Sequence, residues 1–360
     1  MNKREVEVQK DALRDERKLL EELKKSIQEA MKQCEEKIVQ LNAREDMQNL
    51  QSIVHQKKYQ EIIKKQLEGI FEKLLKNEYS TISEYLNDCY INGWVGEMYN
   101  LQGQGVPLLI PIDQEQVVQA VKLDSKLVKP YYDRLGEDVT KLKKAVKHDV
   151  SVGIASGLSY FEIAKRLTGK MTSPFRSALY NAMRIARTEG HRIQQESQYQ
   201  AGKAAVERGA KIKKQWDSTI DARTRMTHIM LDHQTRELDE PFEIDGKKAM
   251  YPGAFGIPEE DINCRCTSLH RAEWALGGAF AKFNGFTNQA EMFDSDEAYE
   301  EFKKKFFSPE NVKYMKYVQT LEKRYSTKNF KKIMENMTDR EYQHYSELLA
   351  ATPIYKNENG

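Results

Sequence analysis

No glycine or proline occurs in this chain before Gly69. Because these two residues are the usual breakers of helices, a long segment without them favours continuous helix. Apolar residues recur in it at spacings of three, four and seven, the pattern of one apolar stripe along a helix. The stripe consists of Leu13, Leu20, Leu23, Ile27, Ala30, Cys34, Ile38 and Leu41.

One apolar stripe cannot bury itself, so the helix needs a partner surface. We therefore expect residues 1–78 to form a long, charged helical arm, either a coiled coil or a helical hairpin. Cys34 lies on the stripe, and we interpret it as a core residue rather than a reactive thiol.

Residues 79–172 form the second predicted region, which is also helical. Four glycines and two prolines fall between residues 93 and 111. This composition predicts a loop with a short apolar strand, which divides two helical stretches. Helices are expected to resume near Gln114, and Ser159 is a candidate cap for a helix that begins near Tyr160.

Composition excludes several classes of protein. With 39% hydrophobic and 31% charged residues, the chain has no apolar run of about 18 residues, the length that a membrane span needs. Its N-terminus lacks the apolar region of a secretory signal. Four cysteines in 360 residues give no disulfide framework, which fits a reducing cytoplasm.

Charge is distributed unevenly along the chain. Residues 160–236 carry 15 Lys and Arg against seven Asp and Glu, an excess of eight positive charges, whereas the net charge of the whole chain is +2. Such a segment is a candidate for phosphate contact, with Lys211, Lys213 and Lys214 as the nucleic-acid candidates. The alternative is that these charges lie on solvated helix faces.

The middle of the chain changes from helical to mixed character. An amphipathic helix is expected from Pro174 to about Gly209, and alternation around Trp216 predicts a strand. Asp245-Gly246 between short apolar runs predicts a hairpin. Residues 173–275 are therefore expected to form a small α+β domain, followed by a helical extension over 276–360.

Two cysteines stand close together as Cys264-Arg265-Cys266. In an extended segment their side chains lie on one face and Arg265 on the other. We expect Asp221 to cap a short helix covering Arg223 to Asp232, with Asp221, Arg225 and His228 on one face. Asp232 comes one turn after His228, where its carboxylate could orient the imidazole.

These thiols and imidazoles suggest a zinc site. Zinc favours four tetrahedral ligands, and Cys264, Cys266 and His228 supply three. The candidates for the fourth are His233, His270, His191 and Asp221. The alternative is a packed core without metal, in which Asp232 binds His228 and an Asp221–Arg225 ion pair joins strand and helix. In either case Trp216 is expected to be a core anchor.

Five short motifs follow one another in a characteristic order and spacing. They are Ala186-Arg187-Thr188-Glu189, Trp216-Asp217, Asp221-x-Arg223-Thr224-Arg225-x-x-His228, Leu238-Asp239-Glu240-Pro241-Phe242 and Asn263-Cys264-Arg265-Cys266. Over about residues 173–270 the chain resembles the phage Mu F-like minor head proteins, also called phage head morphogenesis proteins. One departure is His233, where that family often has glycine, so a tight turn there is in doubt.

The resemblance implies a minor structural protein of a tailed phage or prophage, located in the virion head and in the host cytoplasm during assembly. Its implied partners are the portal protein and other head proteins, with DNA as a further candidate and neither a membrane nor a small-molecule substrate expected. We expect a non-enzymatic protein with no cofactor apart from the candidate zinc. The alternatives are a nucleic-acid-binding protein and a metal-dependent nuclease or toxin-type enzyme.

The residues of the first motif invite a separate interpretation. Arg187 and Glu189 are two positions apart on a helix and so do not face each other. We expect each to reach a different neighbour, for example Asp221 for Arg187 or Arg225 for Glu189. The extension over 276–360 shows no phosphate loop and no His/Cys/Asp cluster, which argues against a fused catalytic domain.

Overall fold

The computed structural model describes residues 2–42, 53–106, 110–112, 120, 131–156, 158, 162, 165, 173–221, 223–277, 279–284, 289–306, 308–327 and 330–351. These residues form a predominantly helical α+β protein, as predicted, whose sheets are small and antiparallel. The chain divides into two compact units, one of residues 1–205 and 253–263, the other of residues 206–252 and 264–360. The segment 173–275 thus contributes to both units.

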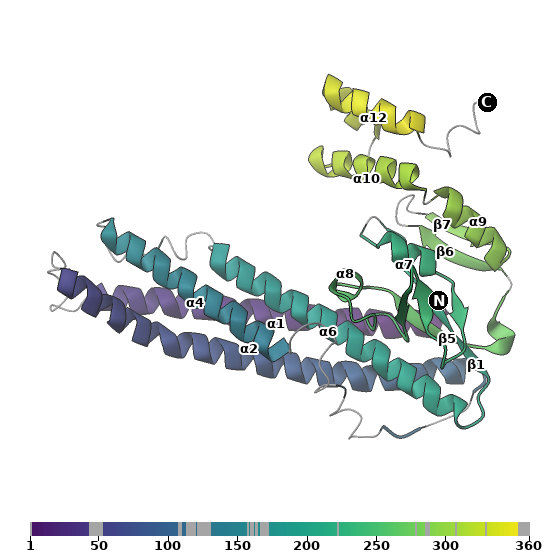
Figure 1. The fold of residues 1–360 in the computed structure, drawn as a ribbon, viewed down its shortest axis with the longest axis horizontal. Coiled ribbons are helices and arrows are strands. Elements are labelled where there is room, and N and C mark those ends of the chain that lie inside the picture. The colour runs from purple at the N-terminus through teal and green to yellow at the C-terminus, as the bar shows by residue number, and fades with distance from the viewer. Residues whose placement is uncertain are drawn as a thin grey trace. The chain divides into compact units, whose positions relative to one another are not determined.

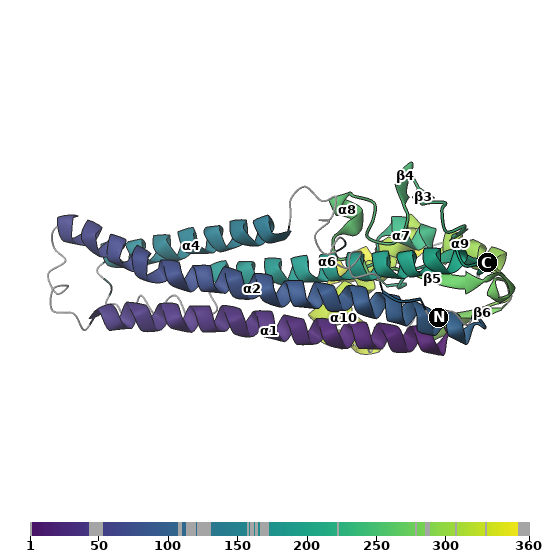
Figure 2. The same ribbon diagram turned by 90° about the horizontal axis from the view of Figure 1, so that it is seen from below.

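Two long antiparallel helices, α1 (Lys3–Asn42) and α2 (Ile53–Gly103), make up much of the first unit and lie side by side (Figures 1 and 2). Their ends are joined where the Asn2 amide donates to Asn100 Oδ1 at 2.9 Å and the Tyr99 hydroxyl donates to Glu7 at 3.0 Å. The helical arm is therefore a hairpin. Cys34 is buried in it as expected, but Leu13 is 55% exposed and does not belong to the buried stripe.

The predicted loop over residues 93–111 is wrong at its N-terminal side, because α2 continues to Gly103. Three of its glycines lie where neighbouring groups approach the helix. A Cβ at Gly93 would lie 2.7 Å from the Gln194 carbonyl oxygen, and one at Gly96 would lie 2.7 Å from Val8. These glycines permit close helix packing rather than a turn. The helices predicted near Gln114 and Tyr160 lie largely outside the described residues.

The rest of the first unit consists of α4 (Tyr131–Ala155), α6 (Ser173–Val206) and the short α8 (Pro258–Asp261). Helix α4 packs on α2, and Lys143 donates to Glu68 at 2.8 Å. The predicted apolar stripe of α6 is confirmed, since each of its members is buried. They are Phe175, Ala178, Leu179, Ala182, Ile185, Ala186 and Ile193. Gly209, with φ +91°, follows the helix at the predicted stop.

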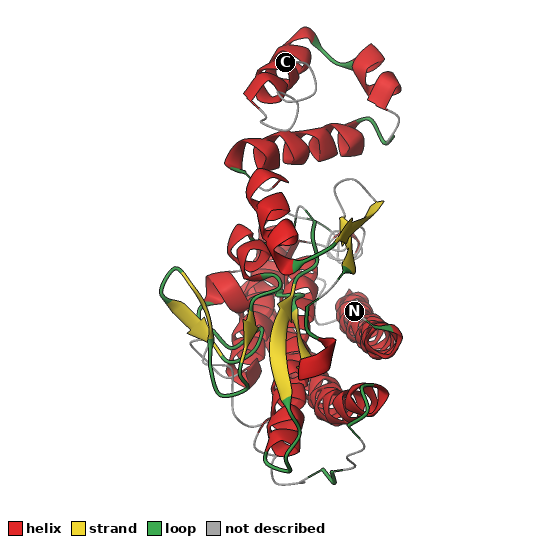
Figure 3. Cartoon of the chain, turned by 90° about the vertical axis from the view of Figure 1, so that its right-hand side faces the viewer, coloured by secondary structure: helices red, strands yellow, loops and turns green. Residues whose placement is uncertain are grey.

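A three-stranded antiparallel sheet in the order β2-β1-β5 organises the second unit. Its strands are β1 (Ile212–Asp217), β2 (Thr235–Arg236) and β5 (Thr267–Ala272), and the helix α7 (Met226–Leu231) follows β1. The 3-10 turn η2 (Glu273–Ala275) follows β5. Figure 3 shows the strands in yellow.

Two hairpins accompany this sheet. The first, β3 (Phe242–Ile244) with β4 (Lys247–Ala249), turns at Asp245 and Gly246, both with positive φ, as predicted. The second, β6 (Phe280–Asn284) with β7 (Gln289–Phe293), lies in the segment that we expected to be helical.

Helices α9 (Asp296–Phe306), α10 (Pro309–Arg324), α11 (Phe330–Asn336) and α12 (Asp339–Ala351) follow, so the prediction of a helical extension holds beyond the hairpin. Phe293 and Tyr299 join Ile220 and Ile229 in one buried cluster. The extension thus shares its core with the β1-α7 segment, within one unit. In the described part of the chain no helix has both the length and the apolar character to cross a membrane.

Candidate functional site

Strand pairing brings the two halves of the candidate site together. In the antiparallel register of β1 and β5, Asp217 lies opposite Thr267, so the end of β1 is next to the start of β5. Helix α7 follows β1 and carries His228, while Cys264 and Cys266 come just before β5. Side chains that are 36 residues or more apart in sequence therefore converge at one end of the sheet.

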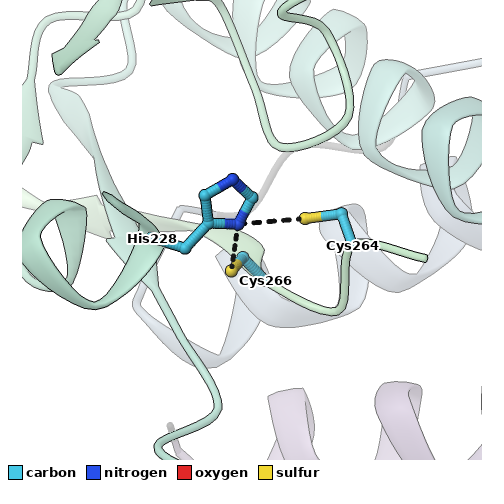
Figure 4. A group of neighbouring side chains, drawn as sticks. All are labelled: His228, Cys264 and Cys266. Atoms are coloured by element: carbon cyan, nitrogen blue, oxygen red, sulfur yellow. Dashed lines mark hydrogen bonds between the residues drawn. The ribbon is translucent and has the colours of Figure 1, made fainter. Parts of the chain in front are cut away.

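His228, Cys264 and Cys266 form a tight and buried group. His228 Nδ1 lies 3.3 Å from Cys266 Sγ and 3.6 Å from Cys264 Sγ (Figure 4). The potential ligand atoms all lie within 4.8 Å of one another, and no residue of the group is more than 5% exposed. The predicted convergence of these three residues is confirmed, and neither cysteine forms a disulfide.

Neighbouring groups fix the position of this cluster. The indole of Trp216, fully buried, meets the His228 ring edge-on at 5.5 Å between centroids, so its prediction as a core anchor is confirmed. Its Nε1–H donates to Ser218 Oγ at 3.0 Å, and the Ser218 hydroxyl donates to the His228 carbonyl oxygen at 2.6 Å. Burial, together with the adjacent Cys264, raises the pKa of the Cys266 thiol well above its ordinary value.

The side chain of Arg265 points away from the two thiols, as the alternation of side chains along an extended segment predicted. Its guanidinium binds both carboxylate oxygens of Asp221, at 2.8 and 2.6 Å. Burial acts to raise the pKa of Asp221, but the hydrogen bond and charge of Arg265 outweigh it and lower the pKa. Asp221 also accepts from the backbone N–H groups of Arg223 and Thr224, which closes a turn.

Two predictions for Asp221 are therefore wrong. The helix α7 begins only at Met226, with the extended Arg225 at its N-cap position, so Asp221 neither caps that helix nor shares a face with His228. The ion pair that joins the turn to the Cys-x-Cys segment uses Arg265, whereas we expected Arg225.

Asp232 belongs to a second buried cluster. Its Oδ1 accepts from the Ser218 N–H at 2.5 Å and from Lys282 Nζ at 2.9 Å, and its Oδ2 accepts from the Tyr299 hydroxyl. Lys282 also donates to Asp217 at 2.7 Å. Since both carboxylate oxygens have these partners among the described residues, the prediction that Asp232 orients His228 is wrong.

In this second cluster one cation, Lys282, lies between two carboxylates, those of Asp217 and Asp232. Burial acts to raise the pKa of Asp217, but Lys282 outweighs it and the pKa is lowered. Asp232 has a raised pKa, because burial outweighs the attraction of Lys282. Lys303 adds a donor to the Asp232 carbonyl oxygen at 2.5 Å.

None of the predicted fourth ligands lies in the His-Cys-Cys group that the described residues form. His233 Nδ1 lies 3.3 Å from Asp296 Oδ1, and the His233 ring stacks on Phe280 with 4.0 Å between ring centroids. Its φ of +67° shows that the tight turn persists with histidine in place of glycine. His270, on β5, is buried opposite Lys214, and His191 lies on α6 in the first unit.

The first motif has a role within the first unit. Arg187 pairs with Glu16 at 2.8 Å, and the buried Glu189 accepts from Arg134 and, at 3.1 Å, from Arg192. The prediction that the two residues reach different neighbours is confirmed, but the partners are Glu16, Arg134 and Arg192 rather than Asp221 and Arg225.

Asn263, the first residue of the last motif, has φ +55°, and its N–H donates to Thr188 Oγ1 at 3.2 Å. The motifs around Thr188 and Asn263 are thus joined directly, a contact that spacing alone did not indicate.

The lysines proposed for nucleic acid are in different environments. Lys214 is fully buried and donates to the carbonyl oxygens of Leu238 and Met250 at 3.0 and 2.9 Å, so its assignment to a nucleic-acid surface is wrong. Burial lowers its pKa to about 8. Lys213 pairs with Glu237 at 2.7 Å, and Lys211 is exposed.

Sequence reasoning missed Lys282, Tyr299 and Lys303, all of which hold Asp232. They lie in the segment taken as a separate helical extension. The only available signal was the lysine at the centre of an alternating Phe-Ala-Lys-Phe-Asn stretch.

In a comparison with known protein families, residues 144–269 match the model of the family described as phage Mu protein F like protein. A match of 34% identity over 227 residues was found with the NAD(+)--arginine ADP-ribosyltransferase EFV of Enterococcus faecalis (strain ATCC 700802 / V583). It covers 61% of this chain but only 44% of that relative, less than half its length.

A second match, of 26% identity over 220 residues, is with the minor head protein GP7 of Bacillus phage SPP1. It covers 59% of this chain and 67% of the relative. No solved structure matches the chain.

Proposed function

Since the chain contains a phage Mu protein F-like domain, we propose that it is a minor structural protein of a tailed-phage or prophage head. The observation that carries this proposal is the match with a minor head protein over 220 residues, a length well beyond the family domain. The role extends to the portal vertex, where the chain acts in head morphogenesis and in DNA packaging or delivery.

The contacts of the motif residues support a structural role. Glu189 binds two arginines, Asp221 binds Arg265 through both oxygens, and Asn263 binds Thr188. The side chains of Glu189 and Asp221 and the backbone N–H of Asn263 thus each have a partner that stabilises the fold. These contacts give the motif residues a role in holding the fold together, and no catalytic task is needed to explain them.

The helical hairpin supports attachment to a larger assembly. Its outer faces carry charged side chains in exposed pairs, such as Arg14 with Asp11 at 3.0 Å. Exposed pairs of this kind contribute little to stability, so these faces are available for contact with other head proteins. We take the portal protein as the first partner to test.

Particle composition tests the proposal directly. Heads purified from producing cells should contain the chain at low copy number by quantitative mass spectrometry, and cells that lack its gene should yield fewer infectious, DNA-filled heads. A tagged chain should also retain the purified portal protein in nuclease-treated extracts. Absence of the chain from purified heads and unchanged particle yield without it would contradict the proposal.

The similarity to an ADP-ribosyltransferase supplies a second candidate function. We propose that this chain is not itself an enzyme, because more than half of that relative lies outside the match. The test is incubation with labelled NAD and arginine-containing acceptor proteins, in which we expect no transfer and no loss of NAD. Labelled acceptor that depends on the intact chain would reverse this assignment.

DNA binding is tested separately. The excess of basic residues over 160–236 favours it, but Lys214 is buried and Lys213 is paired. We expect weak binding that falls steeply with salt, as phosphate contacts do. Fluorescence anisotropy with a short duplex should show less binding for Lys211→Glu than for the exposed control Lys304→Glu.

A further inference from the structure

Two buried thiols and a buried imidazole lie together at one end of the β2-β1-β5 sheet. Thiolates and imidazoles together are the donor set that zinc prefers over magnesium and calcium, which take oxygen ligands. From this donor set and its geometry we propose that His228, Cys264 and Cys266 bind one zinc ion.

The distances within the group fit such an ion. With Zn–S of about 2.3 Å and Zn–N of about 2.0 Å, a tetrahedral site places the sulfur and nitrogen atoms about 3.5 Å apart. The two separations between His228 Nδ1 and the cysteine sulfurs are 3.3 and 3.6 Å. Both nitrogen–sulfur separations therefore match those expected around a tetrahedral zinc ion.

Charge also favours zinc at this position. A buried thiolate without a partner is costly, because its charge is removed from water. Two thiolates and one neutral histidine around Zn²⁺ give a site of zero net charge. Because Cys264, Cys266 and His228 are each at most 5% exposed, this neutrality makes burial of the metal site possible.

A tetrahedral zinc ion held by these three residues would take water as its fourth ligand. Among the residues that the structure describes, no further His, Cys, Asp or Glu ligand atom belongs to the group. The Ser218 hydroxyl, 3.4 Å from Cys266 Sγ, is already used by Trp216 and by the His228 carbonyl oxygen.

The metal would act as a cross-link in the second unit. It joins α7 to the Cys-x-Cys segment before β5, across 36 residues that include the β3-β4 hairpin. The Arg265–Asp221 pair joins the same Cys-x-Cys segment to the turn between β1 and α7. Zinc and the ion pair together therefore hold the start of β5 against the β1-α7 segment, and the inference concerns stability without depending on the head-protein role.

Metal analysis of the full chain, purified without a histidine tag and under reducing conditions, tests the proposal. We expect about one zinc per chain in the wild type and less than about one tenth in Cys264→Ser/Cys266→Ser and in His228→Ala. The matched control for loss of two thiols is Cys34→Ala/Cys89→Ala, which should keep its zinc. For loss of one histidine the control is His233→Asn, since asparagine tolerates the left-handed backbone there.

A measurement on the wild type avoids the possibility that a variant fails to fold. After removal of metal by a chelator, titration with Co²⁺ should produce a thiolate-to-cobalt charge-transfer band that saturates at about one equivalent, and added Zn²⁺ should remove it. Zinc should also raise the thermal midpoint by several degrees. Absence of both the zinc and the charge-transfer band, a disulfide between Cys264 and Cys266, or a different native metal would each overturn the proposal.

Discussion

Lys282 Nζ lies 2.9 Å from Asp232 Oδ1 and 2.7 Å from Asp217 Oδ1, and the lysine side chain is 10% exposed. Asp217 ends β1, Asp232 follows α7, and Lys282 comes from β6, in the segment that follows the motifs of the family. This contact makes the C-terminal hairpin part of the unit that contains the His-Cys-Cys group.

Replacement of Lys282 by methionine should destabilise the second unit. It leaves two buried carboxylates without their cation, a change that typically costs about 3–5 kcal/mol. Hydrogen exchange followed by mass spectrometry should show faster exchange in β1 and β5, whereas the exposed control Lys304→Met should leave exchange unchanged. In a Lys282→Met/Asp217→Asn/Asp232→Asn variant much of the protection should return, and failure to recover it would argue against charge as the cause.

Glu189 is expected to be the most sensitive of the motif acids. It is 1% exposed and pairs with Arg134 and Arg192, so Glu189→Gln leaves two arginines facing a neutral group and should cost about 3–5 kcal/mol in the free energy of unfolding. The comparison variant is Glu16→Gln, which breaks the Arg187–Glu16 pair, a pair more exposed than the Glu189 network, and should cost less than about 1 kcal/mol. Urea unfolding of both variants measures the difference, and equal costs would contradict the assignment of Glu189 to a buried network.

Two glycines of α2 should respond in opposite ways to alanine. At Gly93 the added Cβ meets the Gln194 carbonyl oxygen at 2.7 Å, which forces α2 and α6 apart and should cost about 1–3 kcal/mol. At Gly69 nothing lies within 4 Å, so the helix gains stability of about 0.5–1 kcal/mol. Thermal unfolding followed by circular dichroism should lower the midpoint for one variant and raise it for the other.

Local patterns predicted much of this fold because each depends on residues close in sequence. The Asp245-Gly246 turn, the β1 strand and the apolar stripe of α6 are set by nearby side chains and backbone preferences. The convergence of Cys264 and Cys266 with His228 was predictable because an extended Cys-x-Cys presents two thiols on one side.

Features that depend on a distant partner could not be read in the same way. Gly93 looked like a turn residue because the helix against which it packs is about 100 residues away in sequence. Asp232 was assigned to His228, its neighbour on α7, since Lys282 and Tyr299 lie 50 and 67 residues further along. Tertiary packing decides which partner a polar residue contacts, and the spacing of residues along one helix gives no information about that packing.

Glu78 provides a pH test of the packing in the first unit. It is 2% exposed on α2, and burial, reinforced by the nearby Asp138, raises the pKa of its carboxyl from 4.5 to about 8. Between these values the folded chain keeps the proton while the unfolded chain releases it. The stability contributed by Glu78 is therefore complete below pH 4.5 and is lost as pH rises to about 8.

Glu78→Gln preserves the shape of the side chain but removes the group that titrates. The variant should match the wild type within about 0.5 kcal/mol at pH 4.5 and exceed its stability by about 1–3 kcal/mol at pH 8.5. Urea midpoints at several pH values measure the difference, with the exposed Glu72→Gln on the same helix as the control. A stability difference that stays constant across this range would mean that Glu78 is ionised in the folded chain, and the packing of α2 around it would then have to supply a cation.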